Sequence, residues 1–262
     1  MKLKLSIYIL SFVISGLVII PAANLFSQGF DWQYSARLPQ KSPELFIGLE
    51  GSSSYLIHNS KLEFIEDNCH CTDYANGTGV GYSAGIRLEY WKTGVIGVSG
   101  GLGYKYQPGK FISRPEAIPL ANGDSYITEY EFQSKNSYIY LDIAAKHRLP
   151  GTHFHGGLSL RLMYNVINNS NNVERIIGPS YAPPFPTNPP SFERTISNGK
   201  IPDLYPIYIT PVITLGVDLT FGLGMYATPQ INIGIPVMNA SKTGSWRKWD
   251  VSFGISVFRG MK

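Results

Sequence analysis

The chain has 262 residues, of which 15% are charged and 13% aromatic, and it contains 27 glycines. This length suits one β domain, and few charges with many aromatics and glycines are typical of strands that face lipid. The formal charge of +4 is too small and too dispersed to indicate a nucleic-acid partner.

The first 27 residues are expected to be a secretory signal peptide. Lys2 and Lys4 give a positive start, an apolar run over residues 5–20 follows, and cleavage near Ser27 or Gln28 fits the small residue there. The alternative is an uncleaved anchor helix, although the run is shorter than the ~20 residues that a spanning helix needs. Residues 28–43 would then form a periplasmic segment. No other stretch is long enough for a membrane helix, which excludes a helical membrane protein.

The rest of the chain alternates apolar with small or polar residues in eight segments, which predicts eight β-strands. In the last of them, Trp249, Val251 and Phe253 alternate with Asp250 and Ser252. The predicted strands are residues 44–57, 79–91, 95–106, 137–148, 153–166, 207–221, 225–237 and 248–258.

The connections between these segments alternate between long and short. The long ones are 58–78, 107–136, 167–206 and 238–247. Tight turns at one end and long loops at the other are typical of an up-and-down barrel in an outer membrane. We therefore predict an all-β fold over residues 44–262: an eight-stranded antiparallel up-and-down transmembrane β-barrel. A soluble periplasmic barrel or sandwich is the structural alternative.

The strand count leaves a second alternative open. Residues 126–133 also alternate, and we interpret them as part of the fourth strand that projects beyond the membrane. A ten-stranded barrel would also need residues 110–119 as a strand, and Pro115 and Pro119 argue against that.

The predicted inner faces of the strands collect charges of both signs. A water-soluble sandwich could not bury so many charges cheaply, whereas a narrow barrel can pair them across its lumen. Because eight strands enclose only enough room for side chains, we expect a plugged interior and not a diffusion pore. The predicted interior network is Glu50, Arg87, Glu89, Lys105, Asp142, Lys146, Arg161, Asp218 and Asp250.

Three stretches are similar to one known family. Residues 138–149 read YIYLDIAAKHRL, residues 101–111 read GLGYKYQPGKF, and residues 45–56 read LFIGLEGSSSYL. They resemble strands of PorT-like outer-membrane β-barrels of Bacteroidetes. The chain departs from that pattern at Ala144, where the family usually has proline, and after Phe258, because many barrels end on an aromatic residue. The resemblance implies an envelope barrel, some of whose relatives serve gliding or type IX secretion.

Two groups of side chains are candidates for chemistry. Cys69-His70-Cys71 offers soft metal ligands, but cysteines one residue apart do not match the usual zinc spacing, and loop packing or a redox role is the alternative. His153 and His155 share a strand face near His147, which suggests either a metal or hydrolase site, or a polar cluster at the periplasmic rim. We expect no cofactor.

The predicted loop 167–206 is rich in proline. Such a composition predicts a stiff, extended arm, and exposed Tyr181, Phe185 and Phe192 would make it a candidate extracellular contact loop. The alternative is a variable surface loop without a binding role.

These observations together predict a monomeric, non-enzymatic outer-membrane protein. It would contact outer-membrane lipids through its strands and envelope or secretion proteins through its long loops. The alternatives are a lipid-modifying enzyme of the outer membrane, which needs a histidine and a serine together on the lipid-facing rim, and a transporter of small solutes or hydrophobic ligands, which needs an open lumen.

Overall fold

The computed structural model describes residues 44–66, 69–92, 94–119, 125–180, 182–201, 203–222, 224–242 and 244–261. The predicted signal peptide, the segment 28–43 and Tyr181 lie outside these residues. In the described part, all regular structure is β-strand. No helix there is long and apolar enough to cross a membrane.

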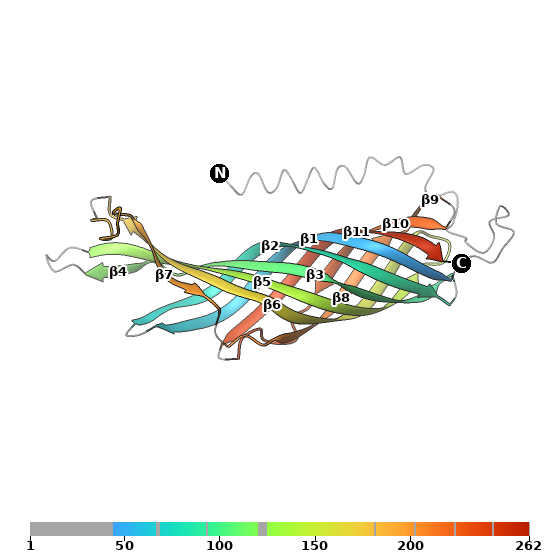
Figure 1. The fold of residues 1–262 in the computed structure, drawn as a ribbon, viewed down its shortest axis with the longest axis horizontal. Helices are drawn as coiled ribbons and strands as arrows, with labels where there is room; N and C mark the ends of the chain where they lie inside the picture. The colour runs from blue at the N-terminus through green and yellow to red at the C-terminus, as the bar shows by residue number, and fades with distance from the viewer. Residues whose placement is uncertain are drawn as a thin grey trace.

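Eight antiparallel strands close into a ring (Figure 1), because each ring strand pairs with the next from β1 to β11, and β11 pairs back with β1. The eight-stranded antiparallel fold is therefore confirmed. The ring strands are β1 (Leu45–Glu66), β2 (Cys69–Trp91), β3 (Ile96–Ile112), β5 (Ser125–Arg148), β6 (Phe154–Gly178), β8 (Ile207–Val217), β10 (Met225–Gly234) and β11 (Ser245–Met261).

Three short strands lie outside the ring order. β4 (Glu116–Pro119) pairs only with β5, and β7 (Glu193–Gly199) adds to β6. β9 (Leu219–Gly222) continues β8 after a break at Asp218 and pairs with β10. The ten-stranded alternative is wrong, because β4 uses part of residues 110–119 without entering the ring.

The predicted long loops are wrong over much of their length, because ring strands run through them. β1 and β2 form a hairpin that fills most of 58–78, and β6 reaches Gly178 inside the predicted loop 167–206. β5 begins at Ser125, so the segment 126–133 does belong to a projecting strand. In Figure 1, β5 and β6 extend past the barrel with β4 and β7. We call these four strands beyond the barrel the arm.

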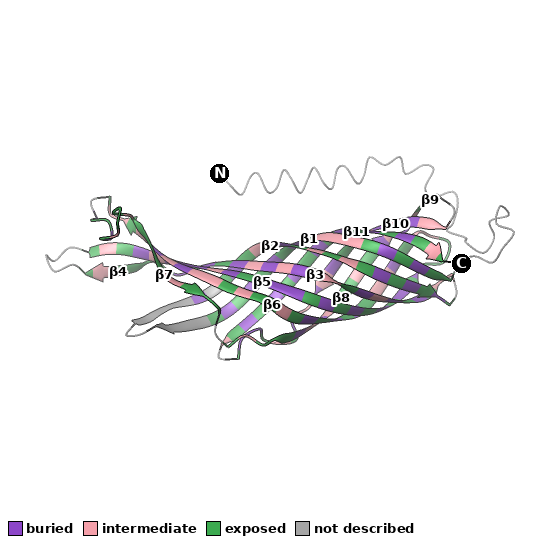
Figure 2. Cartoon of the chain, viewed as in Figure 1, coloured by how far each residue is buried: buried purple, intermediate pink, exposed green. Residues whose placement is uncertain are grey.

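The ring has two different ends. At the short-turn end, β2 is followed by β3, β5 by β6 and β9 by β10 after short connections, and Leu45 and Met261 pair there. At the long-strand end, the hairpin of β1 and β2 and the arm project. A two-residue period places alternate side chains inside and outside along each ring strand, and Figure 2 shows this alternation as bands of buried and exposed residues.

The outer face of the ring is an apolar band. On β1, outward residues run from Ile47 to Ile57, and ten residues at ~3.3 Å each with a tilt of ~40° span about 25 Å, the height of a membrane-facing band. Exposed residues of the band include Leu49, Val80, Ile86, Leu88, Val98, Leu102, Ile139, Leu141, Ile143, Leu158, Leu160, Leu162, Ile213, Leu215, Ile231, Phe253, Ile255 and Val257.

Candidate functional site

The interior of the ring holds the charged side chains that sequence reasoning had placed there. Eight of them are buried residues, and the side chain of Glu50 is 7% exposed. The eight are Arg87, Glu89, Lys105, Asp142, Lys146, Arg161, Asp218 and Asp250. They form ion pairs across the lumen at three levels.

The central level is organised around Asp142 of β5. Oδ2 of Asp142 accepts two hydrogen bonds from Arg161, from Nε at 3.0 Å and from Nη2 at 2.8 Å. Arg87 Nη2 lies 3.7 Å from the same oxygen, while its Nε donates to Glu50 Oε2 at 2.8 Å. Tyr140 donates its hydroxyl to Glu50 Oε1 at 2.5 Å, so four charges and one phenol form a connected network.

The level toward the short-turn end contains two further carboxylates. Glu89 is paired with Lys146 and accepts the hydroxyl of Tyr226 at 2.5 Å. Asp218 accepts from Arg148 Nη2 at 2.5 Å and from Thr228 Oγ1 at 2.8 Å. Asp218 occupies the break between β8 and β9, so this network holds the strands together where their ladder is interrupted.

The level toward the long-strand end has more cations than carboxylates. Lys105 pairs with Asp250. Lys248 is fully buried, donates to the Tyr138 hydroxyl at 2.9 Å and has its ammonium 4.3 Å from the centroid of the Trp246 ring. Among the described residues no carboxylate forms an ion pair with Lys248. Its charge is stabilised by an aromatic face, an interaction that strengthens when the cation is desolvated.

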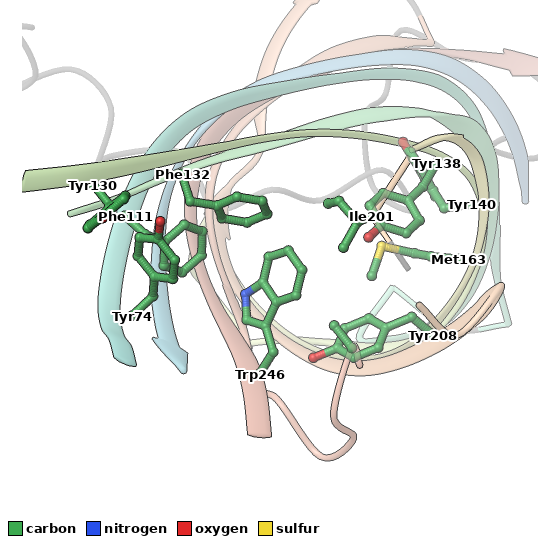
Figure 3. Close-up of a cluster of buried hydrophobic side chains, with 11 residues drawn as sticks. Tyr74, Phe111, Tyr130, Phe132, Tyr138, Tyr140, Met163, Ile201, Tyr208 and Trp246 are labelled. Atoms are coloured by element: carbon green, nitrogen blue, oxygen red, sulfur yellow. The ribbon is translucent and has the colours of Figure 1, made fainter. Parts of the chain in front are cut away.

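Aromatic side chains fill the lumen above and below the ion pairs. Phe46, Trp91, Tyr226 and Phe258 form the lower cluster near the short turns, where Tyr226 and Phe258 stack with centroids 4.9 Å apart. The upper cluster lies toward the long-strand end, and Figure 3 shows its side chains converging from several strands. Its members are Tyr74, Phe111, Tyr130, Phe132, Tyr138, Tyr140, Met163, Ile201, Tyr208, Ala240 and Trp246.

Sequence reasoning missed several buried polar groups of this interior, among them Arg148, Lys248 and His58. Arg148 and Lys248 each lie two residues from a predicted network member, Lys146 and Asp250, so the two-residue period carried the signal. His58 follows the predicted end of the first strand, and no pattern identified it. It is fully buried between Phe111 and Trp246.

The arm has its own ion pairs. Glu131 of β5 bonds to Lys110 Nζ at 2.8 Å and to Gln133 Nε2 at 2.6 Å. Burial acts to raise the pKa of Glu131, but the hydrogen bonds from Lys110 and Gln133 outweigh it, so the pKa is lowered. Arg194 of β7 donates to the buried Glu174 at 2.6 Å.

The proline-rich segment is less exposed than the sequence predicts for the contact loop 167–206. Phe185 is only 5% exposed and packs against the guanidinium of Arg194, 4.6 Å from its ring centroid. Its backbone bridges to Ser191, which folds the segment back on itself. The prediction that Phe185 is exposed is therefore wrong. Phe192 is exposed, and Tyr181 lies outside the described residues.

The other candidate motifs are also placed by the fold. Cys69, His70 and Cys71 belong to β2 and not to a loop, and their side chains lie outside the described part. His155 points into the lumen, with Nδ1 3.3 Å from Asp218 Oδ1, and His153 Nδ1 lies 3.1 Å from the Asp218 carbonyl oxygen. Among the described residues no three His, Cys, Asp or Glu side chains gather into a metal site.

No protein-family model matches the chain, and no curated protein sequence matches it. Among solved structures, Neisserial surface protein A is 11% identical, with 80% of this chain and 96% of that chain covered and a TM-score of 0.33. Ail of Yersinia pestis, solved with a heparin analogue, is 8% identical (82% and 99% covered, TM-score 0.29). The N-terminal β-barrel domain of Pseudomonas aeruginosa OprF is 11% identical (80% and 96%, TM-score 0.26).

Proposed function

We propose that this protein is an outer-membrane barrel without a pore and without catalysis, which anchors an external docking arm in the cell envelope. Its partners would be the surrounding lipids and proteins of the envelope or of secretion. The observation that carries the proposal is the inversion of the usual soluble pattern: apolar side chains cover the outside of the ring, and ion pairs fill its inside.

This inversion has an energetic reason. In water, exposing the apolar band over eight strands would forgo about 25 cal/mol for each Å² that lipid could cover. Buried charges are tolerated only when they are paired and hydrogen-bonded. The networks around Asp142 and Asp218 meet that condition. A barrel in a lipid bilayer accounts for both the apolar outer band and the paired charges inside. A soluble barrel or sandwich accounts for neither.

The filled lumen argues against transport. Arg87 and Arg161, both bonded to carboxylates, occupy the centre of the barrel, and aromatic clusters lie above and below them. A solute would have to break buried ion pairs at every level. The transporter alternative is therefore less well supported than a structural role.

The enzyme alternative also lacks a suitable arrangement. It requires a histidine and a serine together on the lipid-facing rim. His155 is inside the lumen and turned toward Asp218. His147 is exposed on the outer face, but its cross-strand partners are Ile96 and Gly156 and not a serine. We therefore assign the docking role to the arm, in which β5 and β6 extend beyond the apolar band and pair with β4 and β7. The stretches that resemble PorT-like barrels lie in β1, β3 and β5, which supports an envelope role without favouring secretion over other docking.

The test is the gel mobility of the full chain in detergent, unboiled and boiled, after separation of the envelope fractions. We expect a heat-dependent shift confined to outer-membrane material. The purified barrel should then give no conductance steps in a planar bilayer. A soluble periplasmic protein without a shift would overturn the membrane assignment. Reproducible steps that disappear on boiling would overturn the closed lumen alone.

A further inference from the structure

Four exposed cations follow the outer face of the ring just beyond the apolar band at the long-strand end. They are Lys61 on β1, Lys110 on β3, Lys135 on β5 and Arg247 on β11. We call them the cationic row. Strand pairing places them side by side: Arg247 pairs with Asn59, two residues from Lys61, and Lys135 pairs with Pro108, two residues from Lys110.

The row follows one run of neighbouring strands. It spans the five neighbouring strands β11, β1, β2, β3 and β5, and β2 contributes the uncharged Asn76 and Thr78. On the other strands, the outward ladder positions at this end include Asn169 of β6 and Ile207 of β8, which carry no charge, whereas the connecting segments there expose Lys200, Asp203 and Lys242. Those segments carry charges of both signs, whereas the row is cationic throughout.

Most of the row has no acidic partner in the part of the chain that the structure describes. Lys110 bonds to Glu131 at 2.8 Å, with its side chain still half exposed. Among the described residues no carboxylate forms an ion pair with Lys61, Lys135 or Arg247. Within the described part of the chain, these three charges are therefore not neutralised by a carboxylate.

The depth of the row indicates which anion. Outward aromatic residues mark the level of lipid headgroups in membrane barrels. Here Trp249 follows Arg247 by two residues on the outer face, toward the apolar band, and the rings of Tyr82 and Tyr106 lie 5.3 Å apart below Lys110. The cations also point sideways from the strands, as the neighbouring band residues do, and long cationic side chains reach headgroups from such positions.

We propose that the cationic row binds the phosphate groups of anionic lipids in the leaflet around the long-strand end. This inference rests on the proposed membrane function. The lipids would form a preferred shell on one side of the barrel, held by charge at their phosphates and by the aromatic belt at their upper chains. Such a shell would also fix how the barrel, and hence the arm, is oriented toward its neighbours in the plane of the membrane.

The experiment measures lipid selectivity by electron spin resonance. The full chain is reconstituted in phosphatidylcholine vesicles with a trace of spin-labelled phosphatidic acid or phosphatidylcholine, and the motionally restricted fraction gives their relative association constants. We expect phosphatidic acid to be preferred roughly fivefold at low salt, which corresponds to about 1 kcal/mol, the order of magnitude for one cation acting on one anionic headgroup. In Lys61→Gln/Arg247→Gln the preference should fall below about twofold.

The control removes an exposed cation from the arm. Arg114→Gln changes a position outside the row and should keep the wild-type preference. Equal affinity of the wild type for both lipids, or an unchanged preference in Lys61→Gln/Arg247→Gln, would overturn the inference. Competition by inorganic phosphate beyond that of chloride at equal ionic strength would mean a free-phosphate site and would overturn the lipid assignment. A complete absence of motionally restricted lipid would overturn the membrane function itself.

Discussion

Trp246 donates its indole N–H to Nδ1 of His58 over 3.0 Å, between residues that are 188 positions apart in the sequence. Nε2 of His58 lies 3.1 Å from the Pro108 carbonyl oxygen, to which it donates, so the ring is a neutral imidazole with both nitrogens used. The bond between Trp246 and His58 links the first and last strands of the ring, β1 and β11, beside the upper cluster. Ring closure is therefore reinforced by side chains as well as by the strand ladder.

Replacing Trp246 with alanine should destabilise the barrel by about 3–5 kcal/mol, the range for truncating a buried aromatic residue. The side chain is fully buried and its removal also leaves His58 without a donor. Urea unfolding of the refolded barrel in detergent measures the change. Trp249→Ala, on the outer face of the same strand, is the matched control and should cost clearly less. Equal losses in both variants would contradict the role of the upper cluster.

Asp142→Asn should be more damaging than most single polar substitutions. It leaves the buried cations Arg161 and Arg87 short of a carboxylate, and breaking one side of a buried ion pair costs about 3–5 kcal/mol. The midpoint temperature of the boiled-gel shift should fall accordingly. Asp203→Asn is the control: Asp203 is exposed, and asparagine tolerates its positive φ of 55°. A normal midpoint for Asp142→Asn would argue against the central network.

Replacing Lys105 or Lys248, the two buried lysines toward the long-strand end, with methionine should change the unfolding free energy by different amounts. Lys105→Met leaves Asp250 as an unpaired buried carboxylate and should cost about 3–5 kcal/mol. Lys248→Met strands no carboxylate in the described part. It loses one hydrogen bond to Tyr138, and should change the unfolding free energy by about 1 kcal/mol or less. Parallel urea titrations compare them, and a reversed order would show that the charges are distributed differently.

Gly103→Ala should disturb the centre of the lumen. A Cβ at Gly103 would lie 2.5 Å from the carbonyl oxygen of Ala84 and 2.6 Å from the Tyr140 hydroxyl. The backbone oxygen cannot move without breaking the ladder, so we expect a loss of about 1–3 kcal/mol. Gly199→Ala meets no atom within 4 Å and should be neutral. Comparable unfolding midpoints for the two variants would refute the close packing around Tyr140.

The arm should loosen in acid through Glu131. Because the folded pKa of this carboxyl is lowered from its ordinary value of 4.5, its contribution to stability is full above 4.5 and is lost as pH falls through the folded value. Hydrogen exchange of β5 amides beyond the barrel should therefore accelerate on acidification below pH 4.5, after correction for the intrinsic rate. Glu131→Gln should remove this dependence. A pH profile that is the same in both proteins would rule Glu131 out.

The sequence predicts the ring well because successive residues of each strand face lipid and lumen in turn. Apolar residues therefore alternate with polar or charged ones. Trp249, Val251 and Phe253 against Asp250 and Ser252 form a pattern that no other environment explains easily. The same physics identifies most of the lumen charges, since they recur on the inner face. Arg148 and Lys248 were omitted although their register placed them there.

The strand ends could not be predicted because the contrast between the two faces disappears beyond the band. Around Asn169 and Asn172 of β6 both faces are polar, so apolar and polar residues do not alternate there. The sequence of such a strand resembles that of a loop. The burial of Phe185 was equally hidden. It depends on Arg194 and on the backbone bridge to Ser191, which are tertiary contacts that composition cannot indicate.

The length of β6 has a mechanical consequence. From Val166 to Gly178 the strand continues for about twelve residues, or roughly 40 Å at 3.3 Å per residue. A barrel anchored by its apolar band would thus present the tip of the arm to an approaching partner well before that partner reached the lipid surface. A partner would therefore contact the tip of the arm first. A force on the tip would then act on the barrel at its rim, where the arm joins the membrane-anchored strands.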